Sequence, residues 1–176
     1  LSFTGSTAVG KILMQQCAPT LKKLSLELGG NAPFIVFEDA DIDAAVKGAI
    51  ISKFRNSGQT CVCVNRIYAQ DKIYDEFVEK LSRAIAKLRV GNGLDKDVEI
   101  GALINTKGLN KVKQHIQDAV DKGAKVHIGG KHINGLFFEP TVLTDATSDM
   151  VISQQEVFGP VAPVFRFSTE EESIKM

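Results

Sequence analysis

The sequence lacks several features that would place it in whole classes of protein. It has no tryptophan, three cysteines and five prolines among 176 residues. Three irregularly spaced cysteines do not make a disulfide framework, so a reducing compartment is expected. No apolar run approaches the ~20 residues that a membrane span requires. A disulfide-rich secreted scaffold is therefore excluded, and no membrane association is expected.

An excess of charge of one sign is also missing. The chain has 21 basic and 21 acidic residues, and these are interspersed, without a run of five like charges. A basic patch is the electrostatic footprint of a protein that binds nucleic acid or an anionic membrane, so neither partner is expected. The histidines, His115, His127 and His132, are scattered and are predicted to lie on the surface. No spacing of His, Cys, Asp or Glu indicates a metal site.

The sequence does contain a regular alternation of strand and helix patterns. Asp41 is the expected N-cap of one helix, which should end near 56–58, and residues 91–108 read as a long connection. Strands alternating with helices predict an α/β fold with a mainly parallel sheet and flanking helices. The periodicities predict strands at 24–28, 33–37, 62–69, 125–128, 137–143 and 162–167, and helices at 5–18, 41–56, 73–88 and 112–123.

The stretch Gly58-Gln59-Thr60-Cys61-Val62-Cys63 is the most informative part of the chain. It places Cys61 in a short loop between a helix and a strand, where a thiol can be exposed and act as a nucleophile if a base is available. Most cysteines are instead small buried hydrophobes, and we expect that of Cys17. Cys63 is expected to be a packed strand residue. The alternative for Cys63 is a redox switch with Cys61, because a bridge at this spacing would be strained and reducible.

Two segments upstream have the character of a ligand site. Glu27 lies on the polar face of a half-buried strand, just before two glycines that allow a ligand to approach, although a solvated carboxylate is the alternative. Residues 5–10, Gly-Ser-Thr-Ala-Val-Gly, follow a strand and open a helix, whose free amides and dipole attract phosphate. Thr7 replaces the middle glycine of the dinucleotide fingerprint, so an ordinary helix N-cap remains an equal alternative.

Three motifs, taken together, resemble the aldehyde dehydrogenase superfamily. They are the segments 27–33, Glu-Leu-Gly-Gly-Asn-Ala-Pro, 58–61, Gly-Gln-Thr-Cys, and 156–160, Glu-Val-Phe-Gly-Pro. The form of residues 54–63 is most similar to the succinate-semialdehyde dehydrogenase branch. The resemblance implies that residues 1–28 are the end of a Rossmann-like cofactor domain and that 29–176 belong to a catalytic domain. It also implies an internal fragment of a longer protein, which by itself is expected to be inactive.

The resemblance assigns roles to individual residues. Cys61 is the nucleophile that attacks the aldehyde, and Glu27 is the general base that activates the water for deacylation. The cofactor is NAD or NADP. The residues that the resemblance assigns to its binding are Gly5, Ser6, Thr7, Gly10, Leu28, Glu156 and Phe158.

Arg55 carries the expectation about the substrate. It lies six residues before Cys61, where an arginine could cap helix carbonyls or remain in solvent. The resemblance instead implies that Arg55 holds the carboxylate of an aldehyde such as succinate semialdehyde. The expected activity is oxidation of that aldehyde, with a cofactor-independent thiol esterase or acyl-transfer enzyme and an inactive folded fragment as alternatives. The parent enzyme is expected to be a homo-oligomer in the cytoplasm, or in the mitochondrial matrix of a eukaryote.

Overall fold

The computed structural model describes residues 1–176 and divides them into two compact units, Leu1–Gly30 and Asn31–Met176. None of its helices combines the length and the apolar character that crossing a bilayer requires. The assignment of 1–28 and 29–176 to a cofactor and a catalytic domain stays a prediction.

The first unit is a short parallel strand pair with one helix. Strand β1 pairs with β2 so that Phe3 lies opposite Leu26. The helix begins at Thr7, two residues after the predicted start, because the Ser6 hydroxyl accepts a hydrogen bond from the Val9 amide at 3.4 Å and so acts as its N-cap. The elements of this unit are β1 (Ser2–Thr4), α1 (Thr7–Cys17), the 3₁₀ helix η1 (Ala18–Thr20) and β2 (Ser25–Glu27).

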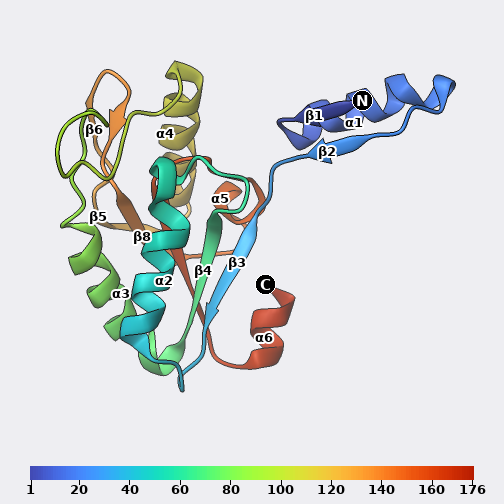
Figure 1. The fold of residues 1–176 in the computed structure, drawn as a ribbon. Coiled ribbons are helices and arrows are strands. Elements are labelled where there is room, and N and C mark those ends of the chain that lie inside the picture. Colours follow the sequence, from blue (N-terminus) through green and yellow to red (C-terminus); the bar gives the residue numbers. More distant parts are fainter. The chain divides into compact units, whose positions relative to one another are not determined.

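The second unit is an α/β structure built on a five-stranded sheet of order β3-β4-β9-β8-β5 (Figure 1). All neighbouring pairs are parallel except β5 and β8, so the predicted mainly parallel α/β fold is confirmed. Its elements are β3 (Ala32–Val36), α2 (Ile42–Phe54), η2 (Arg55–Gly58), β4 (Val64–Gln70), α3 (Asp71–Ile85), α4 (Thr106–Asp121), β5 (Lys125–Ile128), β6 (His132–Asn134), β7 (Phe137–Phe138), β8 (Thr141–Ala146), α5 (Val151–Gln154), β9 (Val161–Phe167) and α6 (Glu170–Lys175).

Successive residues of the central strands face two different hydrophobic cores. In β4, Ile67 belongs to the core that α2 and α3 cover, whereas Tyr68 belongs to the core that α4 covers. In β9, Val164 and Phe165 divide in the same way. A strand alternates its side chains between faces, so a sheet with helices on both faces buries nearly every residue of its central strands. The sheet is therefore the middle of three layers.

Two predicted strands were wrong in their limits. Strand β4 begins at Val64 rather than at 62, because the preceding residues form a turn in which the Cys63 amide donates to the Thr60 carbonyl at 3.2 Å. The strand predicted at 137–143 is divided into β7 and β8 by Pro140, which cannot donate a ladder hydrogen bond. Strand β7 instead pairs antiparallel with β6, which was not predicted.

Candidate active site

The loop that carries Cys61 begins with a run of left-handed residues. After α2 ends, Asn56, Ser57 and Gly58 have φ angles of 51°, 59° and 74°. Residues other than glycine adopt this left-handed backbone conformation at a cost of roughly 1–2 kcal/mol per residue. We call residues 56–58 the left-handed turn. It ends α2 abruptly and precedes the short loop from which the chain enters β4.

The three cysteines differ in their exposure. Cys61 is exposed, whereas Cys17 and Cys63 are buried, and all three are free thiols. The Cys63 thiol donates to the Lys53 carbonyl at 3.1 Å, and burial raises its pKa. Cys63 is thus a packed residue, but it lies in the turn just before β4 rather than in the strand. Its action as a redox switch with Cys61 stays a prediction.

The loop of Glu156 and Phe158 lies directly against the left-handed turn. A Cβ atom on Gly58 would come within 2.2 Å of the Gly159 carbonyl oxygen, so the two backbones touch. On its other side Gly159 contacts Val112 of α4, where a Cβ would meet the Val112 side chain at 2.3 Å. Phe158 has a φ of 55° and is partly exposed. The fold therefore brings together the Cys61 loop and the segment of Glu156 and Phe158, both of which the sequence predicts to contain site residues.

A fully buried lysine lies beneath these two loops. The Lys53 side chain is 0% exposed, and its Nζ is 3.4 Å from Asn65 Oδ1. Burial lowers the pKa of Lys53, while the nearby Cys63 thiol and Glu156 carboxylate oppose that shift. Buried lysines almost always have polar partners, and Lys53 has them on the start of β4 and on the Glu156 loop. The base of the candidate site is thus polar.

The Arg55 side chain is exposed and forms no hydrogen bond or ion pair with the protein. Its backbone, with φ −50° and ψ 130°, has already left the helical conformation. A capping arginine would donate to the last carbonyls of α2, and Arg55 does not. Its guanidinium is therefore free to bind a ligand.

The remaining nominated residues lie together in the first unit. The amide of Gly5 donates to the Glu27 carbonyl at 3.0 Å, which ties the turn before α1 to the end of β2. Gly10 packs against Leu28, because a Cβ on Gly10 would come within 2.7 Å of the Leu28 side chain. The Glu27 side chain is on the exposed face of β2. The strand end and the helix start thus form one local structure.

The prediction that all three histidines lie on the surface was wrong for His115. His127 and His132 are exposed, but His115 of α4 is only 4% exposed, and its Nδ1 has no hydrogen-bond partner. Burial, helped by the Lys111 charge, lowers the pKa of His115 from 6.5 to about 4. His115 lies on the apolar face of α4 with Val112 and Ile116, a spacing that indicates core.

The pH dependence of stability tests the burial of His115. Between pH 6.5 and about 4, His115 is protonated in the unfolded chain but remains neutral in the folded chain. The free energy of unfolding therefore falls as the pH falls. From pH 6 to pH 5 the free energy of unfolding should decrease by roughly 1 kcal/mol more than in a His115→Leu variant. Urea denaturation at both pH values measures this. Identical pH slopes in the two proteins would contradict it.

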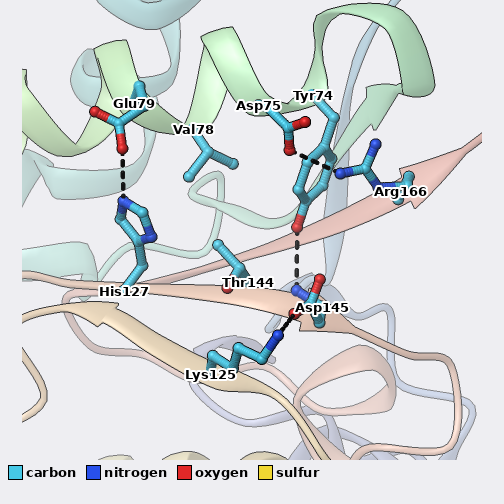
Figure 2. Close-up of a pocket in the computed structure, with 9 residues that line it drawn as sticks. All are labelled: Tyr74, Asp75, Val78, Glu79, Lys125, His127, Thr144, Asp145 and Arg166. Carbon is cyan, nitrogen blue, oxygen red and sulfur yellow. Dashed lines mark hydrogen bonds and ion pairs between the residues drawn. The ribbon is translucent and has the colours of Figure 1, made fainter.

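A cavity of about 350 Å³ lies elsewhere in the second unit, between α3 and strands β5, β8 and β9 (Figure 2). Its acidic and basic side chains lie in pairs at 2.8–3.5 Å, and dashed lines mark these pairs in Figure 2. It contains none of the nominated residues, so we do not place the chemistry there. The lining residues are Tyr74, Asp75, Val78, Glu79, Lys125, His127, Thr144, Asp145 and Arg166.

The sequence reasoning missed three residues that shape the loop. Lys53 follows Ala49 by four residues and so lies on the apolar stripe of α2, a signal that could have revealed its burial. Gln59 belongs to the Gly-Gln-Thr-Cys motif and Ser57 directly precedes it, but their partners are in the 101–104 segment, far away in the sequence. No local pattern indicates such contacts.

The comparisons with known proteins agree with one another. The model of the aldehyde dehydrogenase family matches residues 1–176. Glutarate-semialdehyde dehydrogenase of Pseudomonas putida is 61% identical over 100% of this chain and 37% of its own length. Succinate-semialdehyde dehydrogenase [NADP(+)] of Escherichia coli is 58% identical over 99% of this chain and 36% of its own.

A solved structure supports the same relationship. Succinate-semialdehyde dehydrogenase from Burkholderia pseudomallei superimposes with a TM-score of 0.98 at 58% identity, covering 99% of this chain and 37% of that one. The chain spans a little over a third of the length of the relatives it matches. The sequence, the fold and the arrangement of the motifs all lead to one conclusion: this chain belongs to the aldehyde dehydrogenase family.

Proposed function

We propose that the protein to which this chain belongs oxidises an aldehyde that also carries a carboxylate, with Cys61 as the nucleophile. The observation that carries the proposal is the exposed Cys61 thiol on a loop held by the left-handed turn, in a chain of the aldehyde dehydrogenase family. The relatives are named for glutarate and succinate semialdehyde, both of which have a carboxylate at the far end. The substrate is thus a four- or five-carbon semialdehyde.

The chemistry of the chain's own groups follows from this assignment. The Cys61 sulfur adds to the aldehyde carbon to form a thiohemiacetal, and the backbone amide of Cys61 donates to the oxygen that becomes negative. Loss of hydride from that carbon leaves a thioester on Cys61. Glu27, as the base assigned by the resemblance, takes a proton from the attacking water, and the acid leaves as the thiolate re-forms.

The first unit suits the phosphates of a dinucleotide. Helix α1 has no acidic residue in its first turn, and Ser6 occupies only the Val9 amide, which leaves those of Thr7 and Ala8 for an anion. NAD or NADP, when bound, supplies the hydride acceptor. We assign its pyrophosphate to Gly5, Ser6, Thr7 and Gly10, and its nicotinamide end to Leu28, Glu156 and Phe158.

Alkylation tests the assignment of Cys61 as the nucleophile. In the folded full-length protein, iodoacetamide should modify Cys61 well before Cys17 or Cys63, because only Cys61 is exposed. Activity should be lost in proportion to the modification of Cys61, as peptide mass spectrometry can follow. Equal labelling of the three thiols, or full activity after complete modification of Cys61, would overturn the assignment.

The cofactor requirement separates the alternatives. Turnover of succinate or glutarate semialdehyde should require NAD or NADP, whereas a thiol esterase would hydrolyse an ester substrate without either. Turnover of neither substrate class by the full-length protein would favour a non-catalytic scaffold.

A further inference from the structure

The left-handed turn requires support from outside itself. Three consecutive left-handed residues, two of them not glycine, persist only where the surrounding structure determines their conformation. The bonds within the turn are local: the Asn56 side chain donates to the Gln59 carbonyl at 3.1 Å, and the Gln59 amide donates to the Asn56 carbonyl at 3.1 Å. These hydrogen bonds join residues 56 and 59 to each other, but they do not fix the orientation of the turn relative to the core.

The 101–104 segment supplies the external support. The Ser57 hydroxyl donates to the Gly101 carbonyl at 2.9 Å. Both ends of the Gln59 amide are used, because its Oε1 accepts from the Ile104 amide at 2.8 Å and its Nε2 donates to the Ala102 carbonyl at 3.3 Å. The same Nε2 also donates to the Asn56 carbonyl at 3.2 Å, inside the turn. Gln59 therefore joins the turn to this segment.

The segment itself is firmly anchored. Leu103 is buried in the α4 core, and its amide donates to the Leu136 carbonyl at 2.9 Å. Asn105, which follows the 101–104 segment, is the N-cap of α4. A side chain that is hydrogen-bonded to the 101–104 segment is therefore fixed relative to the core of the second unit.

We propose that Gln59, which lies two residues before Cys61, is a positioning residue for the Cys61 thiol. The side-chain amide of Gln59 fixes the strained turn to the anchored 101–104 segment. This inference rests on the proposed role of Cys61 as the nucleophile. Asparagine is one methylene shorter, and glutamate has no N–H to donate, so glutamine is the side chain whose length and polarity meet all three contacts. The reacting atoms must lie about 3 Å apart, and a displacement of 1 Å can reduce the rate by a factor of about 100.

Gln59→Met in the full-length protein tests the proposal, since it keeps the length and removes the three bonds. We expect kcat for the semialdehyde to fall about 10-fold or more while KM changes less, because binding is retained and geometry is lost. Ser57→Ala, which removes the other bond to the segment, should lower kcat in the same direction. Gln117→Met is the matched control, because Gln117 bonds only Asp121 on the exposed face of α4, at 2.7 Å.

Thiol labelling distinguishes positioning from a general loss of structure. In Gln59→Met, iodoacetamide should still modify Cys61, and Cys63 should remain protected, because its packing against Lys53 does not involve Gln59. An unchanged kcat, an equal fall in Gln117→Met, or exposure of Cys63 to the reagent would each overturn the proposal. The proposed function fails separately, if Cys61→Ser retains turnover.

Discussion

Glu27→Gln in the full-length protein is expected to lower steady-state turnover by a factor of about 100 or more, while the first burst of reduced cofactor survives. The base is needed mainly when water attacks the thioester, and the hydride has left before that step. Glutamine keeps the size of the side chain and its place on the exposed face of β2, but it cannot accept the proton from water. Stopped-flow measurement of cofactor absorbance separates the burst from the steady state.

The matched control is Glu171→Gln, which neutralises an exposed carboxylate on α6 that has no hydrogen-bond or ion-pair partner. It should leave both phases unchanged. If Glu27→Gln loses the burst together with the turnover, the carboxylate acts in activating the thiol instead. Full activity would show that Glu27 is only a solvated residue at the end of a strand.

Regular structure in this chain was predictable because its signals are local. The apolar period of α3 and the Asp41 cap of α2 each depend on residues within a few positions of one another, and both are found as expected. The alternation from Leu24 to Leu28 likewise gave the exposed face of β2 on which Glu27 lies. The motif around Cys61 identified the exposed thiol for the same reason, since a short loop between a helix and a strand is local too.

The features that the sequence did not reveal depend on contacts between distant segments. The sequence predicts an end of the helix near residues 56–58, but not the contacts with residues 101–104 and Gly159 that hold the left-handed turn. The burial of His115 and Lys53 does have a local signal, because each lies on the apolar stripe of its helix, but the polar partners of Lys53 come from β4 and the Glu156 loop. Where tertiary contacts offset the cost of an unfavourable local conformation, patterns in the local sequence do not predict that conformation.

The free guanidinium of Arg55 leads to the most specific expectation about the substrate. Arginine binds a carboxylate through two parallel hydrogen bonds, which suits the far end of a semialdehyde. The free energy that the arginine–carboxylate pair contributes depends on how far the pair is buried. A pair that remains in solvent contributes about 0–1 kcal/mol, whereas truncating one partner of a buried, hydrogen-bonded pair costs about 2–5 kcal/mol. Arg55 is exposed in this chain, so the bound substrate and the rest of the protein must cover it for the larger value to apply.

We expect Arg55→Ala in the full-length protein to lower kcat/KM for succinate semialdehyde by roughly 2–4 kcal/mol, a factor of about 30 to 900. Butyraldehyde has the same number of carbons and no carboxylate, so it should lose little. Arg83→Ala, which removes an exposed arginine paired only with Glu79 of the same helix, should change neither substrate. Steady-state kinetics on both aldehydes measures the contrast, with glutarate semialdehyde as a third substrate to determine the preferred chain length. A purely structural arginine would affect all aldehydes alike, so an equal fall for succinate semialdehyde and butyraldehyde would remove Arg55 from the substrate site.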